Sequence, residues 1–328
     1  MRFQDALVAC IRRIPEGKVA SCGAIARALG DVRAATAVAG WIREHPGLDP
    51  SGQVVRADGR PLLPAVPNDK SRRAESTATG RAESGRFVDH LEAVPLLTEL
   101  RREQLQLAAR VRETDDPGRV ETLGGVDVAY RDHRAFAAAV LLDARSLDVI
   151  EIREQETEAD FPYIPSYLAF REFPAVQGVL SALRRKPDVL FVDGHGRLHP
   201  ALFGFACFAG VSLETPTIGI AKHLLVGTPL SSRRTTNGAI PIALQERIRG
   251  YAWRPARASR AFYVSVGHRV SLDRALHLTQ EATRARYPEP LRIADHVAKE
   301  GKRKKNGERL ASGPTATHRL GSLKEQGV

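Results

Sequence analysis

Hydrophobic and polar positions divide the chain into a short helical region, a polar stretch and a longer region of alternating strand and helix patterns. In the first region, residues 19–46 carry two helical patterns joined by a Gly-Asp turn, and the second helix is expected over roughly 32–44. This spacing predicts a helix-turn-helix unit, whose second helix enters a groove of DNA with Arg33 and Arg43 available to serve it. Because short helix pairs occur in many proteins, an ordinary helical pair is the alternative.

The polar stretch, 68–86, is rich in Ser, Arg, Gly and Ala and has no apolar periodicity, which is typical of a linker. A helical pattern follows over 88–113. We expect Pro95 to break or kink it, because proline lacks the N–H that a helix interior requires.

The longer region begins with three strand patterns within 120–155. It continues with a helix at 175–185, a strand at 187–194, a helix near 202–213, a strand at 215–222, a strand at 261–267 and a helix at 272–286. Three consecutive strands followed by alternating helices and strands predict a mixed α/β sheet with helices packed on it.

Composition narrows the class of protein. A chain of 328 residues, 43% hydrophobic and 27% charged, suits about two ordinary globular domains. No apolar run approaches the ~20 residues that span a bilayer, and the N-terminus lacks the apolar core of a signal peptide. Cys10, Cys22 and Cys207 follow no metal-ligand spacing, and their low, odd number fits a reducing compartment. We therefore expect a cytoplasmic protein that does not engage a membrane.

The net charge of +11 is unevenly placed. Residues 1–68, 69–86 and 299–328 carry +3, +2 and +5, which leaves +1 for 87–298. Basic flanks beside an acid-lined site suit a protein that holds nucleic acid and cuts it. The alternative is that the basic C-terminal segment is only a solvated tail.

Three acidic residues lie in hydrophobic or structured segments where acids are costly. Asp127 follows an apolar strand start, Glu172 lies at the start of a helix pattern, and Asp193 ends the strand VLFV. Three carboxylates suit Mg²⁺ or Mn²⁺, and the chemistry that they suggest is phosphoryl transfer on a polyanion. The alternative is that each acid caps a turn.

Two further motifs flank these acids. Gly194 and Gly196 follow Asp193, and glycines there let backbone amides approach a ligand in the crevice beyond the strand ends. In PYIP (162–165) two prolines fix the backbone, so that Tyr163 and Ile164 are expected to be presented, as in side chains that wedge into a base stack. The alternative is a structural turn with Tyr163 packed into the core.

The first region resembles the DNA-binding domain of O6-alkylguanine-DNA alkyltransferases and the related alkyltransferase-like proteins. The matching strings are IPEGKVAS, IARALG and VVRADGR, within residues 1–62. The resemblance implies a winged helix-turn-helix that binds the minor groove. The family's alkyl-accepting cysteine is replaced by Ser51, its nucleotide-rotating tyrosine by Cys22 and its base-replacing arginine by Thr36. Since thiolate is the effective nucleophile, alkyl transfer is not expected.

The long region resembles endonuclease V, a deoxyinosine-directed nuclease family. The matching strings are GVDVAY, FPYIPSYLAFRE, PDVLFVDGHGRLHP, PTIGIAK, VSVGHR and PEPLRIAD, in order over about 88–298. The resemblance implies an RNase H-like fold and Mg²⁺-dependent cutting of the second phosphodiester bond 3′ of an inosine, with Mn²⁺ able to substitute.

The resemblance also implies roles for individual residues. The metal-binding carboxylates would be Asp127, Glu172 and Asp193. Lys222 and His268 would lie near the scissile phosphate, Lys222 to stabilise the developing charge and His268 to do likewise or to pass a proton. Read alone, these two would be a surface lysine and a satisfied core histidine.

The resemblance also implies which residues recognise the lesion. The wedge that separates the strands would be Pro162, Tyr163, Ile164 and Pro165. The pocket for the flipped base would be lined by Leu168, Gly194, Gly196, Gly219 and Leu225. Ser166 replaces the glycine commonly found after PYIP, which is expected to narrow the pocket or change its hydrogen bonding.

The sequence therefore predicts an α/β protein with an RNase H-like mixed sheet and flanking helices, preceded by a small, mostly helical winged helix-turn-helix domain. The expected boundaries are 1–68 for the DNA-binding domain, 69–87 for the linker, 88–300 for the nuclease domain and 301–328 for the basic tail. The expected function is a monomeric repair endonuclease on double- or single-stranded DNA containing inosine. The alternatives are an inosine-specific ribonuclease and a lesion-binding protein that does not cut.

Overall fold

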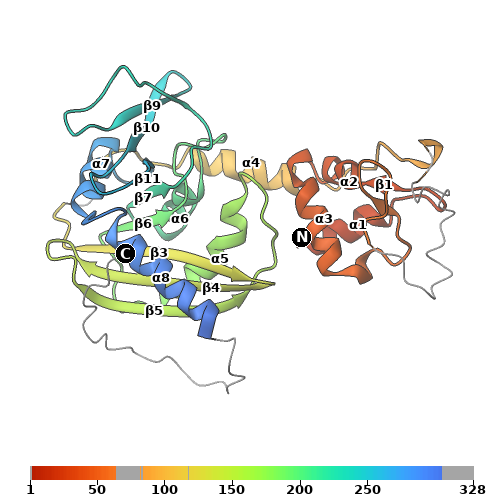
Figure 1. Cartoon of the computed structure of the whole chain (residues 1–328), viewed down its shortest axis with the longest axis horizontal. Helices are drawn as coiled ribbons and strands as arrows, with labels where there is room; N and C mark the ends of the chain where they lie inside the picture. Colours follow the sequence, from red (N-terminus) through yellow and green to blue (C-terminus); the bar gives the residue numbers. More distant parts are fainter. Residues whose placement is uncertain (1, 64–81, 83, 117, 305–328) are drawn as a thin grey trace. The chain divides into compact units, whose positions relative to one another are not determined.

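The structure is a computed structural model that describes residues 2–63, 82, 84–116 and 118–304 (Figure 1). Most of the expected linker, at 69–81 and 83, and the expected basic tail from 305 on lie outside the described residues. No helix in the described part of the chain is long and apolar enough to cross a membrane.

Contacts divide the chain into two compact units. The first comprises residues 1–106 with 159–171, and the second comprises residues 107–158 with 172–328. These units follow packing, whereas the expected domain boundaries follow sequence patterns. Residues 88–106 and 159–171 belong to the first unit because they pack with the N-terminal helices.

The first unit is mostly helical and contains the expected helix-turn-helix. Its elements are α1 (Phe3–Ile11), β1 (Ala20–Ser21), α2 (Cys22–Ala28), η1 (Val32–Ala34), α3 (Ala35–Glu44), η2 (Pro46–Leu48), β2 (Val54–Val55), η4 (Ser84–Arg86) and most of α4 (Leu96–Ala108). Ser21 begins α2 by accepting the N–H of Ala24 on its side chain, and Asp31 begins η1 by accepting the N–H of Arg33. The second helix over 32–44 is thereby confirmed, as η1 followed by α3. The wing is small: β1 pairs in parallel with β2, and Val55 bridges Pro61.

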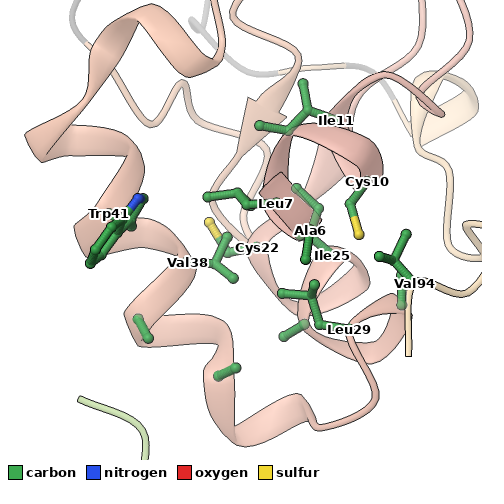
Figure 2. Packing of buried hydrophobic residues seen from close by; sticks show 14 of the residues in the cluster. Ala6, Leu7, Cys10, Ile11, Cys22, Ile25, Leu29, Val38, Trp41 and Val94 are labelled. Atoms are coloured by element: carbon green, nitrogen blue, oxygen red, sulfur yellow. The ribbon is translucent and has the colours of Figure 1, made fainter. Parts of the chain in front are cut away.

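The core of this unit joins α1, α2 and α3, as Figure 2 shows for Leu7, Ile25, Leu29, Val38 and Trp41. Cys10 and Cys22 lie in the same cluster. Burial raises the pKa of both thiols to about 11, so that neither is a ready nucleophile.

The helix expected over 88–113 begins only at Leu96. The reason is that the chain pairs with the end of α2 on both sides of this point: the Val94 N–H donates to the Ala28 carbonyl at 2.9 Å, and the Leu97 N–H, in the first turn of α4, donates to the Leu29 carbonyl at 2.8 Å. These bonds satisfy two of the carbonyls that a helix leaves unpaired at its C-terminus. Pro95 therefore breaks the helical pattern, which was one of the two expected outcomes, and the helix begins at the next residue.

The second unit contains a mixed sheet, as predicted, and this sheet has nine strands in the part of the chain that the structure describes. Its order is β5-β4-β3-β6-β7-β11-β10-β9-β8, in which β3, β6 and β7 are parallel and the other pairs antiparallel. The strands are β3 (Thr122–Arg131), β4 (Arg134–Asp143), β5 (Val149–Glu158), β6 (Val189–Asp193), β7 (Thr217–Ala221), β8 (Thr228–Pro229), β9 (Ile240–Leu244), β10 (Arg247–Trp253) and β11 (Phe262–His268). The helices are α5 (Leu168–Ser181), α6 (Phe205–Leu213), α7 (Leu272–Glu281) and α8 (Glu289–Lys304).

Helices cover both faces of this sheet. α8 runs across β3 and β4 (Figure 1), and a Cβ at Gly125 would lie 2.2 Å from the Pro290 carbonyl, so that only glycine permits this approach. α6 packs on the opposite face, where the Thr217 hydroxyl donates to the Ala206 carbonyl at 2.8 Å. Sequence patterns missed α8 and the β9–β10 hairpin, and they placed α5 at 175–185 rather than at Leu168–Ser181.

Candidate active site

Two of the predicted carboxylates lie on neighbouring parallel strands of the second unit. Val126 of β3 pairs with Val192 of β6, so that the next residues, Asp127 and Asp193, lie side by side where this pairing ends. The carboxyl ends of parallel strands are where an open α/β sheet binds its ligands. The strand register thus brings together two acids that are 66 positions apart in the sequence.

Lys222, just beyond β7, completes this cluster. Its ammonium group donates to Asp193 Oδ2 at 2.6 Å, with the two side chains 52% and 21% exposed. Burial alone would lower the pKa of Lys222, but the neighbouring carboxylates of Asp193, Asp127 and Asp295 raise it, so the side chain is a cation at neutral pH.

Asp127 is the residue of the cluster whose ionised form is destabilised. Burial, together with the negative charges of Asp193 and Asp295, raises its pKa to about 7, although Lys222 and a backbone hydrogen bond oppose the shift. Like charges that crowd a poorly solvated place destabilise the ionised form. A divalent cation would relieve this repulsion, and carboxylate oxygens are the donors that Mg²⁺ and Mn²⁺ prefer, so the cluster fits such an ion.

Two residues at this cluster were missed by sequence reasoning. Asp295 of α8 adds a negative charge beside Asp127. The ring of Tyr287 lies under Lys222, with its centroid 5.3 Å from the ammonium nitrogen, and edge-to-face on Phe262. A signal for Asp295 was present, since it ends the string PEPLRIAD, but the sequence patterns predicted no helix at this place and a single acid there indicates an ordinary solvated position.

The pH dependence of metal binding follows from the pKa of Asp127. Because a carboxylate must lose its proton to bind a cation, we expect the affinity for Mn²⁺ to rise about tenfold between pH 6 and pH 8. Calorimetric titration of the metal-free protein with Mn²⁺ at several pH values measures this. Asp127→Asn should bind more weakly and with a flatter pH profile, and a wild-type affinity that is the same at pH 6 and pH 8 would contradict the prediction.

Two further predicted residues are Glu172 and His268, which lie in α5 and β11 of the second unit. Glu172 is half-buried in α5, and its place among the metal ligands stays a prediction. His268 ends β11, is 7% exposed and accepts the Arg112 N–H on Nδ1 at 3.3 Å. Burial and the charges of Arg112 and Arg269 lower its pKa to about 4, so that the imidazole is neutral at pH 7 and Nε2 carries the proton.

The glycines of the expected base pocket serve close backbone packing. A Cβ at Gly196 would lie 1.9 Å from the Val266 carbonyl oxygen, and one at Gly219 would lie 2.6 Å from the Gly196 nitrogen. Gly194 is likewise buried, whereas Leu225 is 43% exposed; Leu168 begins α5 in the first unit. These positions require glycine whether or not a base binds beside them, so the pocket stays a prediction.

The PYIP segment lies in the first unit. Tyr163 is 62% exposed, so it does not form the packed turn that was the alternative. The expectation that Ile164 is presented is wrong: its side chain is fully buried, because it joins the core of the N-terminal helices. Pro162 is buried and Pro165 exposed.

The N-terminal helix-turn-helix presents a polar face. Arg33, Thr36 and Arg43 are exposed along η1 and α3, at spacings that place them on one side of the helix. Arg33 is held by Asp31 at 2.6 Å. Ser51 is exposed before β2, and within the described residues no side chain hydrogen-bonds its hydroxyl, so that nothing there activates it.

Comparisons with protein families give two matches. The model described as endonuclease V matches residues 105–296, and the model described as the DNA binding domain of 6-O-methylguanine DNA methyltransferase matches residues 2–74. The chain therefore combines two regions that resemble separate families, in the order predicted from sequence.

Individual proteins resemble the second region. An endonuclease V from Thermofilum pendens is 43% identical over 201 residues, covering 60% of this chain and 85% of that protein. The crystal structure of endonuclease V from Streptomyces avermitilis is 37% identical with a TM-score of 0.60, covering 64% of this chain and 94% of that one. A Ciona intestinalis endonuclease V, solved with a DNA containing an inosine followed by a ribo-adenosine, is 26% identical with a TM-score of 0.57, covering 64% and 98%.

Proposed function

Because the chain belongs to the endonuclease V family, a family of metal-dependent nucleases, we propose that it is a repair enzyme that cuts DNA at the second phosphodiester bond 3′ of deoxyinosine. The observation that carries this proposal is the cluster of Asp127, Asp193 and Lys222 where the pairing of β3 with β6 ends, which combines a site for a divalent cation with a fixed positive charge.

We propose Mg²⁺ as the ion, with Mn²⁺ able to substitute, held by Asp127, Glu172 and Asp193. When bound, such an ion supplies an activated water and stabilises charge on the leaving oxygen. Asp127 and Asp193 bind as carboxylates, which requires Asp127 to lose its proton near pH 7. Lys222 neutralises part of the charge at Asp193 and offers its remaining N–H donors to a phosphate oxygen. His268, neutral with its proton on Nε2, pairs with Thr217 at the start of β7, whereas Lys222 follows the end of that strand, so we assign it no contact with this phosphate.

Recognition of the base is assigned to the exposed wedge and a pocket. Tyr163, presented between Pro162 and Pro165, inserts into the base stack as the strands separate. The flipped hypoxanthine enters a pocket in the second unit lined by Gly194, Gly196, Gly219 and Leu225. Backbone groups there distinguish its oxygen from the amino group of adenine.

The N-terminal domain is proposed to bind DNA without transferring alkyl groups. Arg33 and Arg43 lie on the exposed side of the helix that a helix-turn-helix inserts into a groove. An unactivated Ser51 in place of cysteine cannot accept an alkyl group. We further propose a monomer in the cytoplasm, where the three free, buried cysteines Cys10, Cys22 and Cys207 stay reduced.

One alternative substrate is favoured by a specific observation. The Ciona protein was solved with a DNA whose inosine is followed by a ribo-adenosine, so a ribonucleotide beside the lesion is a substrate to test here. The other alternative, a lesion-binding protein that does not cut, is disfavoured by the intact carboxylates.

The deciding experiment incubates the full chain with Mg²⁺ and end-labelled duplexes carrying one inosine, in DNA or in matched RNA, beside Asp193→Ala. We expect the wild type to cut the DNA at the second phosphodiester bond 3′ of the inosine, and Asp193→Ala not to cut it. Cutting of RNA alone would move the function to inosine-containing RNA. Binding without cutting of either would make the chain a recognition protein.

A further inference from the structure

The segment that carries the wedge shares a hydrophobic core with the N-terminal helices. Ile164 and Tyr167 are 0% and 1% exposed and belong to the same cluster as Phe3, Leu29 and Trp41. Phe161 packs edge-to-face on Phe3, with ring centroids 5.7 Å apart. All of these residues belong to the first compact unit. The N-terminal region is thus a packing partner of the wedge segment, which a domain joined only by a linker would not be.

The polar contacts of this segment converge on the turn of the helix-turn-helix. The Tyr167 hydroxyl donates to Asp31 Oδ2 at 2.9 Å, with the Leu97 carbonyl 3.3 Å away. The same Asp31 carboxylate accepts the backbone N–H and the guanidinium of Arg33. One residue therefore holds both the wedge segment and the first arginine of the helix expected to meet DNA.

α4 holds the other side of the segment. The Arg101 guanidinium lies over the Tyr167 ring, 4.4 Å from its centroid, and donates to the Ser166 hydroxyl at 2.6 Å. The Gln104 amide donates to the Ser166 carbonyl at 2.9 Å. Ser166 has a φ of 69°, a left-handed conformation that favours glycine and that these contacts keep in place. Tyr163 extends from this anchored base into solvent.

We propose that the N-terminal domain holds the strand-separating wedge in position, with Tyr167 and Asp31 as the positioning residues. A duplex held by α3 then meets Tyr163 at a fixed position, because helix and wedge belong to one compact body. The inference rests on the proposed function, and it adds that the domain acts in opening the duplex and not only in holding it.

The test measures strand opening separately from cutting. A duplex carries 2-aminopurine beside the inosine, and its fluorescence rises when the neighbouring base unstacks. Saturating full-length protein is added without metal, so that no cutting occurs. We expect Tyr167→Phe, which removes one hydroxyl, to reduce the fluorescence rise at least threefold, and Asp31→Ala to do the same. The matched control is Tyr251→Phe, which removes a tyrosine–aspartate hydrogen bond of equal length, to Asp273, in the second unit.

Cutting with Mg²⁺ provides the second readout. Tyr167→Phe should cut inosine in duplex DNA about tenfold more slowly than the wild type, yet cut inosine in a single strand or in a pre-opened bubble within twofold of it. Equal losses on all three substrates, or no loss in opening or in duplex cutting, would overturn the proposal. A wild type that opens the duplex but cuts nothing would refute the proposed function while leaving this inference standing.

Discussion

Asp127→Asn is expected to lower the rate of cutting by at least ~10³-fold, because an amide cannot supply the charge that a metal-dependent phosphoryl transfer needs at this position. Single-turnover cutting of inosine-containing DNA at saturating Mg²⁺ measures the loss. Retention of more than a tenth of the wild-type rate would remove Asp127 from the metal site.

The same substitution is expected to stabilise the metal-free protein at pH 8. The folded-state pKa of Asp127, about 7, lies above the ordinary value of 3.8, so the protein loses stability as pH rises from about 4 through 7. Asparagine removes that cost, which is on the order of 2–4 kcal/mol at pH 8 and absent below pH 4.

Thermal unfolding in the presence of a chelator measures this gain. The matched control is Asp143→Asn, at the end of the neighbouring strand β4, where backbone N–H groups of Ser146 and Arg145 hold the pKa of the carboxyl below its usual range. Its replacement should leave stability at pH 8 unchanged or lower. A melting temperature of Asp127→Asn at or below the wild type at pH 8 would contradict the assigned repulsion.

Lys222→Met is expected to slow cutting about 10²-fold, since it removes the only lysine that contacts the cluster among the described residues. It should also move the pH–rate profile to higher pH, because the charge of Lys222 lowers the pKa of Asp127. A purely structural lysine would reduce the rate without moving the profile.

Two comparisons sharpen this second prediction. Lys222→Arg keeps the positive charge and should hold the profile at its wild-type position while restoring part of the rate. Lys186→Met serves as the control, because this exposed lysine donates to the Leu213 carbonyl. An unshifted profile for Lys222→Met would show that its charge does not act on Asp127.

The candidate site was predictable where acidic residues interrupt a hydrophobic pattern. Asp127 and Asp193 are acids within apolar strands, and strand pairing placed them together as expected. Lys222 was suggested only by family resemblance, since a lysine after a strand usually faces solvent. Asp295 reaches the site from α8, and no local pattern tells which turn of a helix lies over the end of a strand.

The fold was predictable where periodicity is strong, as in the meander β3–β5 and the helix-turn-helix. It failed where distant segments decide the outcome. The pattern before Leu96 predicts a helix, yet the Val94 N–H pairs with the Ala28 carbonyl at the end of α2. The two prolines of PYIP predict that Ile164 is presented to solvent, yet its side chain lies in the core of the N-terminal helices. Each error reflects tertiary contacts that override a local preference.

The discontinuity of the first unit has a consequence for how the chain is made. Its N-terminal helices leave the ribosome long before Ile164 and Tyr167, and residues 107–158 must be synthesised between them. Until Ile164 and Tyr167 have been synthesised, the apolar surface that they cover stays exposed to water. Covering it requires closing a loop that contains the whole meander β3–β5. If the gene were divided at the linker, neither product would fold as it does in the whole chain. The N-terminal product would lack Ile164 and Tyr167 from its core, and the C-terminal product would expose these side chains to water.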